Sequence, residues 1–332
     1  MTPACRIEID GAQVHGEFMR RLISCSVSDA EGVSSDSCNI VLNDWPCAEI
    51  PRTGALISIF MGYEGALAFM GRFTVEDVSV QMFEHQMTIT GRAAEMGGKV
   101  KEGKERHWDD KTLKDIVSEV AADHGLSPMV DDEIGQFSYP WLGQMGESDI
   151  HFLERLAERH GALMSVKDGK LIFASKASGK SASGSALTPI TITPDILSPG
   201  SGQVQFSDRT KSGKVKASYT DRGKGKKVEI EEESDPNGKA DYVLTEQYAD
   251  EDEARAAAKS MAGDLLRRQA TFSCSIPGNP TARAGAPLTF RGCRPGVDGI
   301  PFIIKSATHN ISKSGYTTDL SGESQSGPKG GG

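Results

Sequence analysis

The sequence predicts a mainly β protein with an α+β insert. Two long blocks contain short runs of Val, Ile, Thr and Phe separated by Gly, Pro and Asp, which is typical of strands joined by turns. Apolar residues at helical spacing are concentrated between these two blocks. The length of 332 residues favours two or three domains, and the 37 glycines favour short elements with many turns.

The first block, residues 1–96, is predicted to form a barrel or a sandwich of strands. CRIEID alternates in polarity and ends at Asp10-Gly11, which is a turn signal. Phe73 and Val75 alternate with polar neighbours, as in a sheet that has one buried face. Further strands are expected in SCNIVLN, ALISIFMGY, FMGRFTVEDVSVQM and HQMTITGRA.

The insert, residues 97–178, is predicted to begin with a polar loop, GGKVKEGKERHWDD, and to continue into a first helix. Asp109 or Asp110 can cap the start of this helix, and Gly125 suits the left-handed residue that ends it. ALMSVKDGKLIFA closes the insert as a β-hairpin with a two-residue Asp-Gly turn. The buried face of the first helix is expected to consist of Leu113, Ile116, Val117, Val120 and Ala121.

A second helix of the insert is predicted within GESDIHFLERLAERHGALMSV, residues 146–166. Ser148 is a good N-cap, Asp149 favours the positive N-terminus of the helix, and Gly161 ends it. The buried face is expected to consist of Ile150, Leu153, Leu156 and Ala157, flanked by Phe152 and His160.

The same stretch raises the hypothesis of an active site, because Glu147 and Asp149 could be paired carboxylates and His151 or His160 a base. Acid–base catalysis by a carboxylate pair needs two groups that converge across a cleft. These two residues straddle one helix start instead. We therefore interpret the charges as a helix cap followed by a helix face that is exposed to water.

The second block is separated from the insert by a flexible linker, residues 179–186, which is rich in Gly, Ser and Ala. This block, residues 187–321, contains strands and one helix. Asp250 caps that helix, and Glu253 follows three residues later as in a capping box. Residues 322–332 are predicted to be a disordered tail.

Sequence motifs for a nucleotide, a metal or an activated nucleophile are absent: there is no GxGxxG after a strand, no GxxxxGK[ST], no HExxH and no GxSxG. No pair of Cys or His residues has zinc-ligand spacing. His107, His124 and His309 are interpreted as surface or core-edge residues, and the three tryptophans as buried within their own domains. We predict no catalytic, cofactor-binding or metal-binding residues.

The charge and hydropathy of the chain exclude further classes. A net charge of −9 argues against a nucleic-acid-binding surface. No apolar run approaches the roughly 20 residues that span a bilayer, and the N-terminus lacks the pattern of a secretory signal. We expect a protein that folds in a cytoplasm, has no membrane-spanning segment and recognises no nucleic-acid sequence.

Two stretches resemble the phage late control gene D family, the baseplate hub proteins of contractile tails. GESDIHFLERLAERHGALMSV followed by KDGKLIFA is similar to a signature of that family and of the N-terminal part of type VI secretion VgrG spike proteins. A second, looser match is the closing stretch that includes GYTTDLSG, where Phe302 stands at the position of a family tyrosine. The signature residues are Glu147, Ser148, Asp149, Phe152, Leu153, Leu156, Gly161, Gly315 and Tyr316.

The resemblance implies two tube-like β-barrel domains joined by a helix-containing domain. It implies a homotrimer that connects a six-fold tail tube to a three-fold central spike in the virion baseplate, after assembly in the host cytoplasm. The implied partners are a separate spike protein, a tail tube or tube-initiator protein, and baseplate wedge proteins. We expect a separate spike because the chain continues only shortly after its last predicted strand.

Two alternatives to this hub remain open. One is a cell-wall hydrolase at the tail tip that uses Glu147 or Asp149 with a histidine. The other is the hub of a secretion or extracellular contractile machine. The cysteines are interpreted as small buried apolar residues, but Cys25 and Cys38, on neighbouring predicted strands, could pair in a virion that leaves the reducing cytoplasm.

Overall fold

A computed structural model provides the fold. It describes residues 2–14, 16–32, 36–93, 102–167, 169–176, 179, 186–208, 211–221 and 223–326. Most of the predicted linker and the end of the predicted tail, residues 180–185 and 327–332, lie outside the described residues. Among the described residues, no helix is long and apolar enough to cross a membrane.

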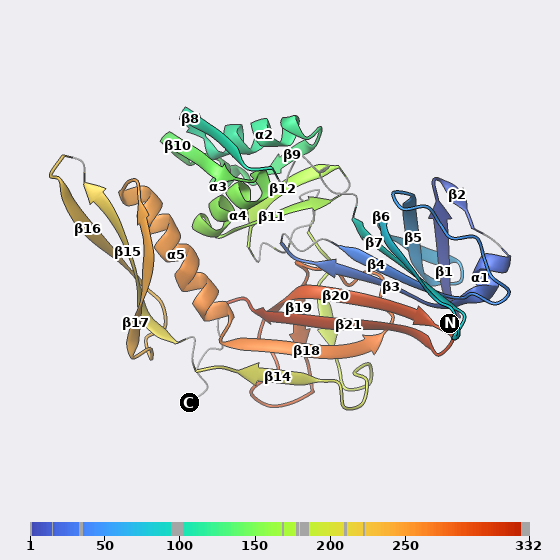
Figure 1. Ribbon diagram of the computed structural model, residues 1–332. Coiled ribbons are helices and arrows are strands. Elements are labelled where there is room, and N and C mark those ends of the chain that lie inside the picture. The colour runs from blue at the N-terminus through green and yellow to red at the C-terminus, as the bar shows by residue number, and fades with distance from the viewer. Residues whose placement is uncertain are drawn as a thin grey trace.

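The protein is mainly β, as the sequence predicts, and its longer helices lie in the insert and in the second block (Figure 1). The first block contains β1 (Pro3–Ile9), β2 (Ala12–Gln13), α1 (Glu17–Arg21), β3 (Leu22–Ala30), β4 (Ser37–Asn43), β5 (Leu56–Tyr63), β6 (Ala66–Gln81) and β7 (Gln86–Ala93). The insert contains β8 (Lys104–Thr112), α2 (Leu113–Asp123), β9 (Ser127–Val130), α3 (Asp132–Gly135), β10 (Ser138–Glu147), α4 (Asp149–Arg159), β11 (Ala162–Lys167) and β12 (Lys170–Ser175). The second block contains β13 (Ile190–Ile192), β14 (Gln203–Phe206), β15 (Ser212–Asp221), β16 (Lys226–Glu233), β17 (Ala240–Tyr248), α5 (Glu251–Arg267), β18 (Ala270–Pro277), β19 (Pro287–Phe290), β20 (Phe302–Ser312) and β21 (Gly315–Ser324).

One 13-stranded sheet contains strands from both blocks. Its order is β14-β18-β21-β20-β3-β4-β7-β6-β5-β1-β2, and β19 joins β13 to β20. The two blocks meet where β20 pairs antiparallel with β3, from Ser306 opposite Ala30 to Ser312 opposite Ser24. Strands that lie some 280 residues apart in the chain are therefore direct neighbours in this sheet.

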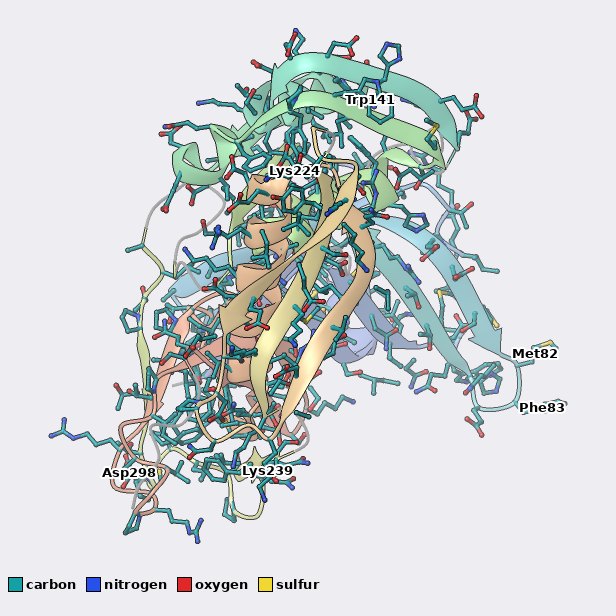
Figure 2. All side chains as sticks on the ribbon, turned by 90° about the vertical axis from the view of Figure 1, so that its left-hand side faces the viewer. Met82, Phe83, Trp141, Lys224, Lys239 and Asp298 are labelled. Carbon is teal, nitrogen blue, oxygen red and sulfur yellow. The ribbon has the colours of Figure 1, made fainter. Side chains whose placement is uncertain are left out.

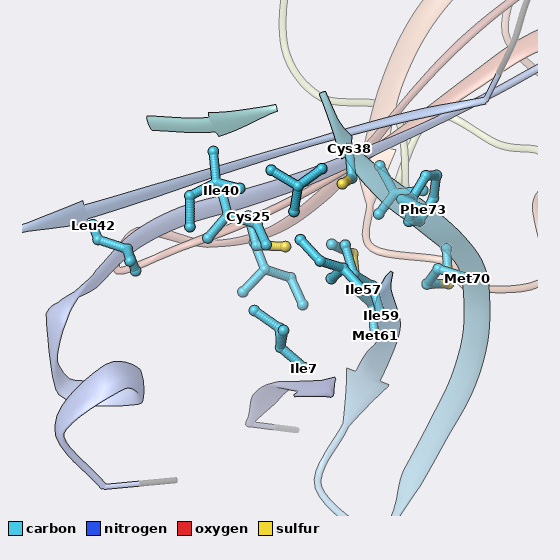
Figure 3. Packing of buried hydrophobic residues seen from close by; sticks show 14 of the residues in the cluster. Ile7, Cys25, Cys38, Ile40, Leu42, Ile57, Ile59, Met61, Met70 and Phe73 are labelled. Carbon is cyan, nitrogen blue, oxygen red and sulfur yellow. The ribbon is translucent and has the colours of Figure 1, made fainter. Parts of the chain in front are cut away.

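Alternation along the strands gives each half of this sheet a hydrophobic core. In the first half, β1 and β5 pack over β3, β4 and β7, and Ile7, Ile40 and Phe73 are fully buried between them (Figure 3). In the second half, β13 and β19 pack over β18, β20 and β21. The rings of Phe272 and Phe302 meet there edge to face at 5.1 Å between centroids.

The insert has its own core, which α2 and α4 form with the strands around them. The apolar face expected for α2 is buried throughout, and Phe152, Leu153 and Leu156 of α4 are fully buried. The ring of Phe152 stacks on Trp108 of β8 at 4.8 Å. The predicted hairpin forms from β11 and β12, with Gly169 at a positive φ of 73° in its turn.

The middle of the second block forms a separate unit. Strands β16-β15-β17 make a three-stranded sheet, and α5 packs against it with a row of small residues, including Ala254, Ala258 and Ala262. In Figure 1 this unit stands at the far left, beside the insert. Asp250 caps α5 through a bond from the amide of Glu253 (2.9 Å), as predicted.

The prediction of a polar loop before α2 is wrong for the second part of that stretch, because residues 104–112 form strand β8, which pairs with β10. The predicted cap, Asp109 or Asp110, is also wrong. Thr112 is the N-cap, and its hydroxyl and the Asp115 carboxylate form a reciprocal capping box. The helix starts where this pair satisfies its free amides, after the strand has ended.

Two of the three tryptophans are exposed, contrary to expectation. Trp45 is 64% exposed and packs on His85, and Trp141 is 48% exposed on the outer face of β10, whereas Trp108 is buried. Figure 2 shows Met82 and Phe83 projecting from the turn between β6 and β7, at one extremity of the molecule. Both of these side chains are more exposed than Trp141.

Candidate functional site

The signature stretch places its acidic residues at the junction between β10 and α4. Gly146 takes a positive φ of 69° at the end of β10, so the chain can turn into the helix. Ser148 is the N-cap and accepts a hydrogen bond from the amide of His151 (3.3 Å), as the sequence predicts. Asp149 is then the first helical residue, where the helix dipole favours a negative charge.

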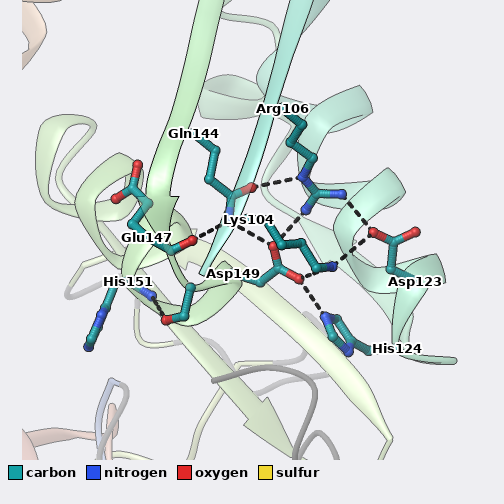
Figure 4. Close-up of polar contacts among 9 residues, drawn as sticks. Lys104, Arg106, Asp123, His124, Gln144, Glu147, Asp149 and His151 are labelled. Carbon is teal, nitrogen blue, oxygen red and sulfur yellow. Dashed lines mark hydrogen bonds and ion pairs between the residues drawn. The ribbon is translucent and has the colours of Figure 1, made fainter. Parts of the chain in front are cut away.

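The carboxylate of Asp149 is fully buried at the centre of a polar cluster (Figure 4). Its Oδ2 accepts from Lys104 Nζ and from His124 Nε2, both at 2.7 Å. Its Oδ1 accepts from Arg106 Nη2 at 2.7 Å and from Gln144 Nε2 at 2.9 Å. Side chains from β8, β10 and the C-terminal end of α2 thus converge on the start of α4.

A second layer of contacts orients these donors. Arg106 donates from Nη1 to Asp123 at 2.6 Å and from Nε to the Gln144 carbonyl at 2.8 Å. Gln144 also donates to the backbone oxygen of Glu147 at 2.9 Å. The cluster is therefore closed, with each charge matched by opposite charges or amide groups.

The electrostatics follow from this arrangement. Burial by itself raises the pKa of the Asp149 carboxyl. Hydrogen bonds from Lys104, Gln144 and His124 to the charged form, together with the nearby guanidinium of Arg106, outweigh burial and lower the pKa to about 2. Asp149 is thus ionised at neutral pH and has no proton to donate.

The predicted cap forms, but the interpretation of the charges that follow it as a water-exposed helix face is wrong for Arg155 and Arg159, which form partly buried ion pairs. Asp149 is buried, and Glu147 binds Arg155 in a two-pronged ion pair. Arg159 reaches out of the insert to Glu246 and Glu253 of the α5 unit. The helical spacing alone could not indicate these partners, because they come from strands and from a helix far away in the sequence.

The geometry gives no support to an acid–base pair at this stretch. Figure 4 shows the His151 side chain directed away from Asp149. His160 hydrogen bonds to the Tyr139 hydroxyl at 2.6 Å, and burial lowers its pKa to about 4. Glu147 is held by Arg155, so the two carboxylates of the hydrolase hypothesis act in separate contacts. In the part of the chain that the structure describes, no group of His, Cys, Asp and Glu has the arrangement of a metal site.

Ionic contacts also join the insert to the rest of the molecule. Lys167 of β11 binds Asp29 of β3 at 2.5 Å and Asp36 at 3.3 Å. Lys176, just after β12, binds Asp264 of α5 at 2.8 Å. The signature region therefore lies in a unit that forms ion pairs with the elements on both sides of it.

The two signature residues of the closing stretch, Gly315 and Tyr316, begin β21, directly after the turn that follows β20. The Tyr316 hydroxyl lies 3.0 Å from His309 Nδ1, and His309 Nε2 donates to the Ala282 carbonyl at 3.0 Å. His309 is fully buried, which corrects its interpretation as a surface or core-edge residue, and burial lowers its pKa to about 4. Phe302 is also fully buried, at the start of β20.

The remaining candidate residues lie apart from the cluster. His107 is exposed on β8, whereas His124 is one of the Asp149 partners. Cys25 lies opposite Ile40, not opposite Cys38, and its thiol contacts Cys5 instead. All six cysteines are free thiols, and those on the core faces of strands are buried: Cys25, Cys38 and Cys274.

Sequence comparison identifies close relatives over nearly the whole chain. The model of a family described as phage tail baseplate hub (GPD) matches residues 65–315. The probable baseplate hub protein of Escherichia phage P2 is 30% identical over 358 residues, and that of Escherichia phage 186 is 29% identical over 359 residues. Each alignment covers 96% of this chain and 92% of the relative.

Structural comparison finds the same fold in more distant proteins. The 43 kDa tail protein of prophage MuSo2 from Shewanella oneidensis superposes with a TM-score of 0.71 at 15% identity, over 97% of this chain and 98% of that one. The E. coli c3393 protein superposes with a TM-score of 0.62 at 12% identity, over 98% of this chain and 78% of that one. It is described as a type VI secretion component similar to the T4 tail proteins gp27 and gp5.

The resemblance to hub proteins that rests on the signature stretch is confirmed by these relatives. The family match begins just before β6 and ends at the start of β21, so it contains the Asp149 cluster and β20, whereas β3 lies outside it. The chain belongs to the phage tail baseplate hub (GPD) family.

Proposed function

We propose that this chain is the trimeric hub of a phage tail baseplate, an adaptor between a six-fold tail tube and a three-fold central spike. Its relatives in phages P2 and 186 are described as probable baseplate hub proteins. The observation that supports the trimeric adaptor is the strand order of the main sheet. The proposed partners are a separate spike, a tube or tube-initiator protein, and wedge proteins, within the virion baseplate.

Eight strands of the main sheet divide into two equivalent sets. Their order is β6-β7-β4-β3 from the first block, followed by β20-β21-β18-β14 from the second block. All seven neighbouring pairs are antiparallel. Each set begins with a hairpin, β6–β7 or β20–β21, and ends with two further strands. This repetition supports two tube-like domains, residues 1–96 and 187–321, joined by the insert, residues 97–178, and the linker, residues 179–186.

Among the described residues, one end of this eight-stranded row is a free edge, and the other end is free along the second half of its strand. The distal half of β6, residues 76–81, pairs with β7, whereas β5 pairs only with residues 66–74. At the other end, β14 pairs with β18 alone. Unpaired edges bind further strands readily. Because the row has an even number of alternating strands, β6 of one copy and β14 of the next meet antiparallel.

Closure of three such rows gives a ring with a particular symmetry. Three chains supply six four-stranded units, so the ring has true three-fold symmetry and approximate six-fold symmetry. Such a ring can contact a six-fold tube through features that the two halves share. It can contact a three-fold spike through features that only one half carries. This combination is what an adaptor between the two requires.

The edge pairing can be tested with two cysteines. In a Cys47→Ser background, Ser79→Cys lies on the free edge of β6 and Gln205→Cys on the free edge of β14, on the same face of the sheet. We expect a short bismaleimide to join assembled double-variant chains into covalent trimers. Either single variant should give dimers at most.

The matched control combines Ser79→Cys with Thr245→Cys, an exposed position on β17 outside the main sheet. It should give no covalent trimer. A particle mass or an image reconstruction that lacks a three-fold hub would refute the trimer itself. A three-fold hub without the 79–205 cross-link would refute this edge pairing only.

A further inference from the structure

The two-stranded sheet of the insert, β8 with β10, has one buried face and one exposed face. Trp108, Leu142 and Gln144 are buried and belong to the inner face. The residues on the outer face are Trp141, Gly143 and Met145 of β10 and, opposite them, Asp109, His107 and Glu105 of β8. We call this outer surface the indole face.

The ring of Trp141 extends along its own strand and lies over Gly143. A Cβ atom at position 143 would be only 2.7 Å from the far edge of this ring, which is closer than real Cβ atoms come to other atoms. Gly143 therefore provides the space that the ring occupies, and a larger residue would displace it. Trp141 remains 48% exposed in this position, and Met145, further along the strand, is 72% exposed.

The exposed indole lacks a partner that other aromatic rings of this chain have. On the buried side of the same two strands, the Arg106 guanidinium lies 4.7 Å from the centroid of the Trp108 ring. In the first block, that of Arg6 lies 3.8 Å from the centroid of Phe60. Among the described residues, no cation and no second ring lies on Trp141. An indole is the aromatic side chain that attracts a cation most strongly.

Carboxylates flank the apolar side chains of the indole face. Asp109 lies opposite Trp141 and Glu105 lies opposite Met145, so each apolar side chain has a carboxylate beside it. Within the part of the chain that the structure describes, Glu105 forms no ion pair, and the only one of Asp109 is with His107, at 3.3 Å. Two carboxylates on this face are thus available to a positively charged partner.

The lysines and the arginine of β8 do not neutralise these carboxylates. Lys104 and Arg106 bind Asp149 on the buried side of the strand, both at 2.7 Å. Lys111 lies close enough to Asp115 to contribute to the lowered pKa of that carboxyl. The outer face therefore combines an indole, a thioether and two carboxylates without an arginine or a lysine.

The position of the indole face separates it from the other contacts that we propose. Strands β8 and β10 lie on the side of the insert that is away from the main sheet (Figure 1), and Trp141 is at the top of the molecule in Figure 2. The edges of β6 and β14, where we propose that copies of the chain meet, belong to the main sheet. A contact between copies at those edges leaves the indole face open to a different protein.

We propose that the indole face binds a segment of another baseplate protein that presents an arginine or a lysine beside an apolar side chain. The cation lies over the Trp141 ring and next to Asp109, and the apolar side chain packs on Met145. A sugar ring could also stack on an exposed indole, but it is neutral and does not compensate the charge of the carboxylates, so charge complementarity favours the basic segment. One chain carries the complete face, so the proposal does not depend on the trimeric ring.

Photo-cross-linking in assembled tails tests the proposal. Tails are made with a Trp141→benzoylphenylalanine hub and irradiated, and the linked peptides are sequenced by mass spectrometry. We expect a link to one segment of another protein, with an arginine or a lysine close in sequence to the linked residue. The control is Val243→benzoylphenylalanine, at a position that is 58% exposed on β17, and it should not link to that segment. Met145→benzoylphenylalanine replaces the first variant if that hub does not assemble.

A charge reversal then tests whether the linked segment is held by the carboxylates. Glu105→Lys combined with Asp109→Lys should lower the yield of the link roughly tenfold, because like charges then meet across the contact. Glutamate in place of the cation of the partner should restore the yield. The control pair, Glu119→Lys with Glu158→Lys, adds the same charge at exposed positions on α2 and α4 and should leave the yield unchanged.

Four results would overturn the inference. They are a link to a glycan, a link to a second copy of the hub, a yield that does not respond to the charge reversal, and no link from either labelled position in tails that assemble. The mass of the hub in the same particles is a separate measurement. A hub that is not three-fold would contradict the proposed function and would leave the contact at the indole face standing.

Discussion

At the residue scale, Asp149 shows how the signature stretch stabilises the fold. Its carboxylate is buried and holds Lys104, Arg106 and His124 together. Removing this carboxylate takes from each of these groups its most buried partner, and leaves Lys104 and Arg106 with Asp123 alone as a counter-charge. The main role of Asp149 is therefore to fix the start of α4 against β8, β10 and α2.

We predict that Asp149→Asn destabilises the protein by about 3–5 kcal/mol at neutral pH, because the partly buried Lys104 and Arg106 lose one of their two carboxylate partners and keep only Asp123. Urea unfolding measures this loss. Glu158→Gln is the control, since that side chain is exposed on the same helix. The pKa of Asp149 falls from 3.8 to about 2 on folding, so its contribution is present above pH 3.8 and is lost as the pH falls towards 2. An Asn variant as stable as the wild type would contradict this role.

A second prediction concerns His309. Burial lowers its pKa from 6.5 to about 4, so the unfolded chain takes up a proton in this range that the folded protein does not. Stability is therefore complete above pH 6.5 and decreases as the pH falls towards 4, by up to about 3 kcal/mol for this group. His309→Gln should show a flatter pH profile over this range in urea unfolding. His107→Gln, at an exposed position, should leave the profile unchanged.

The sequence predicted only part of this residue-level picture. It identified Ser148 as the cap and the apolar positions of α4, because both depend on local spacing. It did not predict the burial of Asp149 or His309. Their partners come from β8, from α2 and from residue 282, and no local pattern links those positions.

At the element scale, β8 shows why a strand can look like a loop. The side chains of β8 that point into the insert include the buried Trp108 and also Arg106, which donates a hydrogen bond to Asp149. Hydrophobic alternation is therefore missing, although the strand pairs with β10 along its length. The strands of the main sheet were predictable because their inward positions are apolar.

The start of α2 allows a direct test of its observed cap. Thr112→Ala removes the hydroxyl that accepts a hydrogen bond from the Asp115 amide, and it leaves the Asp115 carboxylate with only the bond from the backbone amide of residue 112. We predict that the free energy of unfolding falls by about 1 kcal/mol, which is the usual effect of removing an N-cap side chain. Thr112→Ser keeps the hydroxyl and should retain most of the stability. Thermal unfolding of both variants measures the difference, and equal losses would show that the hydroxyl is not the stabilising group.

At the scale of the whole molecule, charged contacts join the core of the insert to the cores on either side of it. The ion pairs of Lys167 with Asp29 and Asp36 connect the β11–β12 hairpin of the insert to the first block. Burial and the nearby charge of Asp29 raise the pKa of Asp36 to about 6, in spite of the opposing effect of Lys167. The two carboxylates are compatible at neutral pH because the lysine lies between them.

We predict that Lys167→Met weakens this contact and lowers the free energy of unfolding by an amount that depends on pH. Without the ammonium, the pKa of the Asp36 carboxyl rises further, and above that pKa its negative charge is opposed by the charge of Asp29. The free energy of unfolding of the variant should be about 2–4 kcal/mol lower than that of the wild type near pH 8. Part of this loss should be recovered near pH 5, where protonation of one carboxylate removes its charge. Urea unfolding at both pH values measures the effect. A loss that is equal at both would mean that the lysine acts by packing alone. Lys111→Met, at an exposed position, is the control.

The sequence predicted the mainly β class and the insert between two strand-rich blocks. It did not predict that both blocks belong to a single sheet, since the seam between β3 and β20 joins residues that only the complete fold brings together. It also did not separate the β15–β17 unit from the rest of the second block, because the alternation within a strand does not indicate which strands pair with it.

The seam between β3 and β20 has a consequence for the accuracy of assembly. A ring of six separate subunits of two kinds would need some means to keep them in alternation, and any mistake would place two of one kind side by side. Here each unit of the first kind is linked by peptide bonds to its neighbour of the second kind. A ring of three chains would then alternate by construction, and the order around the tail axis would be encoded in the gene rather than selected during assembly.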